Sequence, residues 1–327
     1  MEHRDGPASS HFTPLPLKGN TNFTSLEHAP LSDNMRKSLD HAPQASLTAW
    51  GVPFAIGEPI LLDDQPVEVD ISPVQAKWLV FAHTSDERPN PVNEHGFISP
   101  MRGAGQLGEH AADYIIRYTD GTEVNVPIRR RYEVGAYQRG WGENCFLAVA
   151  AHKPKPIKAH HEQMNPDWGR SQTRASSSDW APWTNWLWAW ENPYPDKLIC
   201  AVRFVPVTGR IVVSALSAGV VDAHPFRWKS RQKALLHMPS EITFNPEIDE
   251  DGLLSQLQLD MGQVISALPR TCYPNAAWAA SCNNQLPSAS ERDIIVEYTA
   301  HPSAQFHLSF GEEQKAFIPV ADVEKML

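Results

Sequence analysis

The chain has 327 residues, of which 42% are hydrophobic and 20% charged, with 28 prolines and 18 glycines. This length suffices for two ordinary domain cores, and the composition favours short strands and turns over long, charge-rich helices. The formal net charge of −10 argues against a nucleic-acid partner, because phosphates are repelled; the densest basic run, Arg129-Arg130-Arg131, is typical of a solvated sheet edge.

Targeting signals and cysteine motifs do not stand out in the sequence. The polar N-terminus has no apolar stretch typical of a signal peptide or membrane span, so we expect a cytoplasmic protein without a membrane partner. The four cysteines, at 145, 200, 272 and 282, lack the short spacing of zinc ligands or redox pairs, and buried free thiols are expected.

Residues 1–46 contain scattered prolines without helical or alternating periodicity, which predicts an extended, irregular N-terminal arm. Short strand-like runs separated by turn residues follow and predict an antiparallel, jelly-roll-like β-sandwich over 47–220. The pair Asp120-Gly121 between two such runs indicates a hairpin. The expected strands are 67–71, 77–83, 114–118, 123–128, 185–190, 198–206 and 210–217.

The remaining part of the chain is predicted to add a smaller unit. Residues 221–240 carry a His-Pro pair and a basic cluster and are interpreted as a linker. Residues 241–327 again contain short strand-like runs, which predict a small β-rich domain. The fold class is therefore all-β. The expected strands are 255–259, 263–268, 293–298, 305–308 and 316–319.

Three motifs occur in a fixed order: the entry strand WGVPFAIG (50–57), the apolar strand AKWLVFAH (76–83), and GEHAADY (108–114) running into YTDG (118–121). In this order they resemble the galactose-binding-like β-sandwich modules attached to bacterial carbohydrate-active enzymes. The chain also resembles the leading part of larger bacterial polypeptides that continue into a metal-dependent hydrolase domain of the PHP type. This second resemblance implies an accessory part without the catalytic barrel and a downstream catalytic domain as partner.

Aromatic residues supply the first candidates for ligand binding. Trp186, Trp188 and Trp190 alternate and therefore share one strand face, which is typical of a sandwich core. Trp180 and Trp183 lie in the Ser/Pro-rich segment before that strand and are better candidates for stacking on a sugar ring.

A glycine-flanked loop provides further candidates. Trp141 lies between two glycines, with Glu143 and Asn144 beside it, and this pattern suits stacking on a sugar with hydrogen bonds to its hydroxyls. A turn with Trp141 folded inward is an equal alternative. His95 and Arg102 complete the predicted ligand-binding residues.

Catalytic and metal-binding patterns are incomplete. Glu143, Glu109 and His110 are the candidates for a hydrolase site, but no spacing brings them together from sequence alone. Glu247, Asp249 and Asp251 resemble the start of a calcium loop, yet the final bidentate Glu is missing, so an acidic surface turn is favoured. No cofactor is expected, with calcium as the alternative.

These patterns lead to three hypotheses. The favoured one is a non-catalytic carbohydrate-binding or structural accessory module of a bacterial hydrolase, which binds a carbohydrate or another small polar ligand. The second is a self-contained hydrolase that acts on glycosides or other substrates through loop carboxylates and histidines. The third is a protein-interaction scaffold, which is favoured if the tryptophan-rich face is exposed and flat and the protein forms an oligomer.

Overall fold

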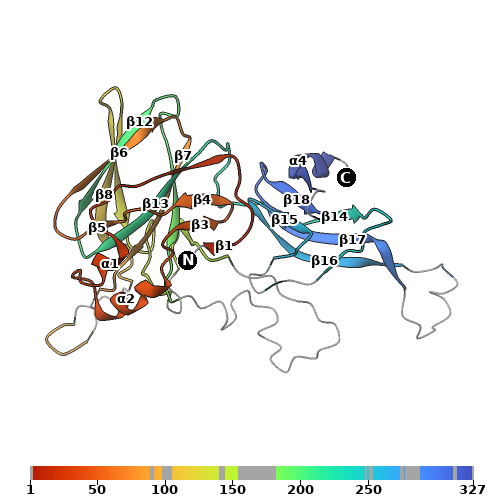
Figure 1. The fold of residues 1–327 in the computed structure, drawn as a ribbon. Coiled ribbons are helices and arrows are strands. Elements are labelled where there is room, and N and C mark those ends of the chain that lie inside the picture. The colour runs from red at the N-terminus through yellow and green to blue at the C-terminus, as the bar shows by residue number, and fades with distance from the viewer. Residues whose placement is uncertain are drawn as a thin grey trace. The chain divides into compact units, whose positions relative to one another are not determined.

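The computed structural model describes residues 3–88, 92–97, 105–139, 144–153, 182–246, 249, 253–272, 276, 288–311 and 315–325. The protein is all-β, with 48% strand and 7% helix, which confirms the predicted fold class. Described residues from Ala8 to Phe226 form one compact unit, and those from Arg227 onward form another (Figure 1). No helix in the described part of the chain has the length and apolar character needed to span a bilayer.

The first unit is a sandwich of two antiparallel sheets. The first sheet has the order β10 (Ala148–Ala150), β11 (Trp186–Glu191), β7 (Trp78–Ser85), β13 (Ile211–Gly219) and β2 (Phe12–Leu15), and β5 (Ile60–Leu62) also pairs with β13. The second has the order β6 (Val67–Val74), β12 (Ile199–Pro206), β8 (His110–Tyr118) and β9 (Glu123–Arg129). A small sheet contains β1 (His3–Arg4), β3 (Ser46–Ala49) and β4 (Val52–Ala55).

Aromatic side chains from both sheets meet in the sandwich core. Phe81 of β7 lies 5.2 Å from Tyr114 of β8 and 5.3 Å from Trp188 of β11, measured between ring centroids. Trp186 and Trp190 are buried in the same cluster, so the prediction that the alternating tryptophans form the core is confirmed. Each buried ring stabilises the fold by roughly 2–3 kcal/mol relative to an exposed one.

The predicted hairpin is present between β8 and β9. Gly121 has φ +84°, which glycine adopts without steric cost. The Asp120 side chain accepts a hydrogen bond from the Thr122 amide. The local sequence therefore determines this turn, and the turn determines the register that pairs Tyr114 with Val126.

The N-terminal segment is not a wholly extended arm, and this prediction is corrected. Besides strand β2 it contains α1 (Phe23–Leu26), α2 (Asp33–Ser38) and the 3₁₀ helix η1 (Leu39–His41). Leu26, Met35 and Leu39 are buried in one cluster with Trp183 and Val212. These helices are too short to show a helical period in the sequence, and packing against the outer side of the first sheet stabilises them instead.

The second unit contains two three-stranded sheets. One has the order β14 (Gln232–His237), β17 (Ser288–Ala300) and β16 (Gly262–Cys272), and the other β15 (Leu257–Leu259), β18 (Gln305–Ser309) and β19 (Lys315–Pro319). Tyr298 of β17 and Phe306 of β18 join the two sheets edge to face at 5.0 Å. Helix α4 (Val320–Lys325) follows β19.

Strand β14 lies within the segment predicted to be a linker. Its side chains alternate between half-buried and exposed, because one face covers the core and the other carries Lys233 and His237. Of the basic cluster that suggested a linker, Lys233 lies on the solvent side of an edge strand, where lysine is common, and Arg227, Lys229 and Arg231 precede that strand.

Candidate functional site

Five strands of the sandwich begin or end at one edge of the first unit. β7 ends at Ser85, β9 at Arg129 and β12 at Pro206, while β8 starts at His110 and β13 at Ile211. Connections at the end of a sandwich are the usual location of binding residues, because a rigid scaffold positions them. The side chains at this edge form two distinct groups.

The first group is a partly buried polar cluster, the Arg130 network, formed by Asp86, Arg88, Glu109, Arg130 and Thr208, of which Asp86 and Arg130 are fully buried. Arg130 Nε lies 2.9 Å from Glu109 Oε2. Its Nη1 and Nη2 donate to the carbonyl oxygens of Asp86 at 3.0 Å and Thr208 at 3.2 Å. Arg88 Nη2 donates to Glu109 Oε1 at 3.1 Å. The network thus joins three loops of the sandwich edge.

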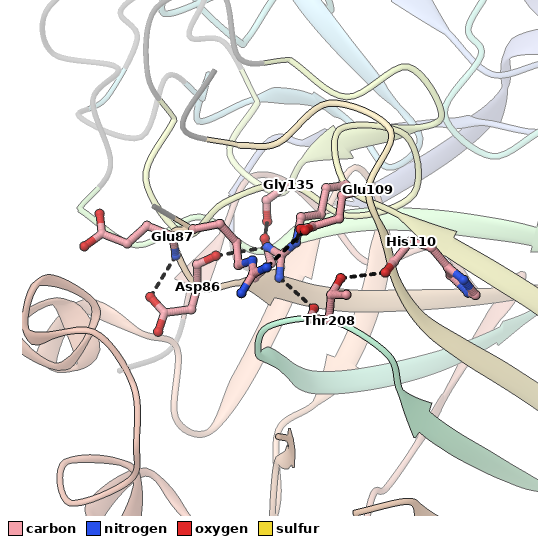
Figure 2. Close-up of polar contacts among 9 residues, drawn as sticks. Asp86, Glu87, Glu109, His110, Gly135 and Thr208 are labelled. Carbon is pink, nitrogen blue, oxygen red and sulfur yellow. Dashed lines mark hydrogen bonds and ion pairs between the residues drawn. The ribbon is translucent and has the colours of Figure 1, made fainter. Parts of the chain in front are cut away.

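Burial controls the electrostatics of this network. Arg130 is 1% exposed, so the interpretation of the arginine run as a solvated edge is wrong for its middle residue. Burial lowers the pKa of Arg130 to about 10, against the opposing attraction of Glu109, and the guanidinium remains charged at neutral pH. Figure 2 shows Asp86, Glu109 and Thr208 lying close together at this edge, while the imidazole of His110 points away from them.

Gly209 makes the close approach of the two arginines feasible. It lies in the turn between β12 and β13 with φ +63°. A Cβ atom here would lie 2.4 Å from Arg130 Nη2 and 2.7 Å from Arg88 Cδ. Backbone conformation and available space therefore both require glycine at this position.

Asp86 connects the network to the N-terminal helices. Its Oδ2 accepts a hydrogen bond from the Ser32 amide at 2.7 Å, and its Oδ1 accepts one from the Ser32 hydroxyl at 2.6 Å. Ser32 is also the N-cap of α2, and its Oγ accepts from the Met35 amide. One buried carboxylate therefore anchors the start of α2 to the end of β7.

The second group is an exposed aromatic stack, the Phe146 platform, formed by Arg129, Tyr132 and Phe146. The rings of Tyr132 and Phe146 lie 5.0 Å apart, and the Arg129 guanidinium lies 4.3 Å from the centroid of Tyr132. Phe146 is 66% exposed. An aromatic ring that is fixed on one side and open on the other is an effective surface for stacking.

Backbone geometry holds the platform together. Arg131 has φ +61°, a conformation uncommon for a non-glycine residue, and it separates the buried Arg130 from Tyr132. The amides of Phe146 and Leu147 donate to the carbonyls of Arg131 and Tyr132, both at 3.0 Å. The two segments of the platform are therefore paired along their backbones.

Glu133 fixes the arginine of the platform. Its carboxylate is buried and accepts hydrogen bonds from the Arg129 amide at 2.8 Å and from Arg129 Nη2 at 2.6 Å. These hydrogen bonds raise the pKa of Arg129 above its ordinary value. The guanidinium is thereby held over Tyr132 rather than left free in solvent.

The described candidate residues are dispersed over several environments. Glu109 belongs to the Arg130 network, whereas the imidazole of His110 pairs with Asp113 at 3.0 Å and its backbone carbonyl accepts a hydrogen bond from the Thr208 hydroxyl at 2.6 Å. Asn144 is exposed two residues before Phe146. His95 lies in an exposed turn capped by the Asn93 side chain.

Two further candidates have structural surroundings that differ from an open binding surface. Trp183 is 6% exposed and its indole N–H donates to Asn185, so it belongs to the core and offers no open ring face. Asp249 accepts a hydrogen bond from the Leu253 amide. The candidates Trp141, Glu143, Arg102, Trp180, Glu247 and Asp251 lie outside the described residues.

The site offers binding groups more clearly than reacting groups. Both oxygens of Glu109 are held by guanidinium groups, and within the described ranges no group of three His, Cys, Asp or Glu side chains is placed to hold a metal ion. The sequence interpretation did not include Tyr132 and Phe146. The sequence does place these two aromatic residues on either side of Trp141. This pattern alone is weak evidence for a contact, because the pairing of the two rings depends on the backbone turn at Arg131.

A scan of protein-family models found none that matches the chain, and a search of curated proteins found no significant match. The geometry of the site is therefore the basis for a functional interpretation.

Proposed function

We propose that the chain is a non-catalytic carbohydrate-binding module that serves as an accessory part of a hydrolase, and that it binds its ligand at the Phe146 platform. The observation that carries this proposal is the 66% exposed ring of Phe146, which packs against the ring of Tyr132 at a tilt of 40°. The C–H face of a pyranose ring is apolar and stacks on such a surface, while its hydroxyls need polar partners at the rim.

Polar partners are available beside the platform. The amide of Asn144 both donates and accepts hydrogen bonds, and it is exposed two residues before Phe146. Arg129 contributes a cation that Glu133 already holds in place. Pre-positioned groups lower the entropic cost of binding, because fewer side chains must be ordered by the ligand.

The Arg130 network supports a binding role rather than catalysis. A general acid or nucleophile must reach the substrate, but Glu109 is turned toward Arg88 and Arg130, which occupy its two oxygens. In this proposal catalysis belongs to a separate hydrolase domain. The alternating tryptophans are buried, so they do not supply the exposed aromatic face that would favour the scaffold hypothesis.

A glycan-array screen tests the proposal directly. We expect the unaltered protein to bind a subset of glycans and Phe146→Ala to lose about 10–100-fold in affinity, the range expected when one aromatic side chain is no longer buried by the ligand. Phe317→Ala is the matched control, because Phe317 is 59% exposed in the second unit. Binding that survives Phe146→Ala unchanged contradicts the proposed site, and binding to no glycan contradicts the proposed ligand class.

A further inference from the structure

A histidine in the sandwich core is linked to the turn that carries the platform. His83 of β7 is fully buried. Its Nε2 lies 2.9 Å from the backbone carbonyl of Glu133, and its Nδ1 lies 2.9 Å from the Tyr114 hydroxyl. Glu133 is the residue whose side chain holds Arg129. The imidazole therefore contacts the backbone of the same residue whose side chain holds Arg129 of the platform.

The tautomer of His83 follows from its partners. A carbonyl oxygen only accepts hydrogen bonds, so Nε2 carries the proton and donates to Glu133. Nδ1 of the neutral ring then accepts from the Tyr114 hydroxyl. This arrangement satisfies both ring nitrogens while the ring is uncharged.

Protonation would disrupt this arrangement. A proton on Nδ1 would abolish the hydrogen bond that Tyr114 donates to it, and a positive charge would lie in an apolar core, while Nε2 would still donate to the Glu133 carbonyl. Trp188 stacks on the imidazole with an interplanar angle of 11°, and Phe81 stacks on it at 30°. Burial lowers the pKa of His83 to about 4, while the bond to the Glu133 carbonyl acts in the opposite direction.

The surroundings of His83 contain few titratable groups. From β8 the phenol of Tyr114 faces it, and burial raises the pKa of that phenol well above its ordinary value. From β11 and β13 the cross-strand neighbours are Trp186 and Val213, which do not titrate. From the platform turn the neighbour is the Glu133 carbonyl, and the Glu133 carboxylate is bound to Arg129.

We propose that His83 is a positioning residue for the Phe146 platform, and that the cost of a positive charge in the apolar core drives the protonated imidazole away from the Glu133 carbonyl, which releases the platform turn and with it the ligand. The ligand-release step rests on the proposed function, whereas the control of the turn does not. Neutral His83 fixes the Glu133 carbonyl, Glu133 fixes Arg129, and Arg129 lies over Tyr132. Acid conditions therefore weaken the platform from inside the core.

Hydrogen exchange measured by mass spectrometry on the full chain tests the control of the turn without any ligand. His83→Leu removes the donor to Glu133, and His83→Gln retains an amide N–H at a similar distance but does not titrate. At pH 7 we expect His83→Leu to exchange about tenfold faster in residues 129–134, in line with the loss of one buried hydrogen bond. His83→Gln is expected to match the unaltered protein, and strands β16 and β17 of the second unit serve as the internal control.

The pH profile provides the second arm. After correction for intrinsic exchange rates, the unaltered protein should lose protection in residues 129–134 as pH falls toward 4, and His83→Gln should not. If His83→Leu does not fold, the comparison of the pH profiles of the unaltered protein and His83→Gln still tests the proposal. Equal profiles for the unaltered protein and His83→Gln, or a loss of protection spread equally over β7, β8 and β11, would overturn the proposal. If the exchange data confirm that His83 controls the turn but no glycan binds, the positioning role of His83 stands and only the proposed ligand class is rejected.

Discussion

The two units use charged residues in opposite ways. In the first unit Arg130 is buried and its guanidinium bonds to Glu109, Asp86 and Thr208 from different loops. In the second unit Arg231 and Lys233 pair with Glu297 on the outer face of β14 and β17, and both cations are more than half exposed. The comparison indicates that buried charges hold the loops of the sandwich edge in place, whereas exposed pairs contribute little to stability.

The largest effect is expected from Arg130→Met, which keeps a long, unbranched side chain but removes the buried charge. Glu109 and two backbone carbonyls would lose a partner, and the free energy of unfolding should fall by about 3–5 kcal/mol. Urea unfolding followed by fluorescence measures this change. A loss below about 1 kcal/mol, the usual range for exposed pairs, would show that the network is no more important than a surface pair.

The next largest effect concerns acid stability. The pKa of His83 is about 4 in the folded protein and 6.5 as the ordinary value, so the unfolded chain binds more protons between these limits. The contribution of neutral His83 to the free energy of unfolding is fully present above pH 6.5. It falls by roughly 3 kcal/mol as pH decreases to about 4.

Urea unfolding at pH 7 and pH 4.5 checks this dependence. His83→Gln is the control because it keeps a donor and does not titrate, and its stability should decrease less over the same pH interval. A parallel decrease in both proteins would mean that other groups cause the acid sensitivity.

A smaller effect is expected where the N-terminal helices attach. Ser32→Ala removes both the N-cap of α2 and a hydrogen bond to Asp86, and a destabilisation of about 1–2 kcal/mol is expected. Asn22→Ala is the matched control, because Asn22 caps the exposed start of α1 without a bond to the sandwich. Equal melting temperatures for the two variants would contradict the anchoring role of Asp86.

The smallest effect is expected from Arg231→Met in the second unit. Its partner Glu297 keeps Lys233 at 3.1 Å, and Arg231 is mostly exposed. The free energy of unfolding should change by less than about 0.5 kcal/mol. A change comparable to that of Arg130→Met would erase the contrast between the two units.

Local patterns in the sequence predicted much of the fold. Alternation predicted that Trp186, Trp188 and Trp190 share a buried face, and Asp120-Gly121 predicted the hairpin, because both signals arise between residues close in the chain. The helices before residue 46 were not predicted, since their stability comes from packing on Val212 and Trp183 and not from their own periodicity.

The site was less predictable because its contacts are distant in sequence. Arg130 resembles its two neighbours in the run of three arginines, and what distinguishes it are contacts with residues distant in sequence, such as Asp86 and Thr208, 44 and 78 positions away. Glu109 was selected as a carboxylate near a histidine, but its partners are arginines. Phe146 gained its importance from an unusual backbone conformation at Arg131, which no local pattern signals.

Titration of the strongest glycan found in the array provides the most direct test of the central claim. The dissociation constant should rise about 10–100-fold for Phe146→Ala, with an unchanged melting temperature, and should remain the same for Phe317→Ala. Equal dissociation constants for the unaltered protein and Phe146→Ala would show that the exposed ring beside the Arg130 network is not the ligand-binding surface.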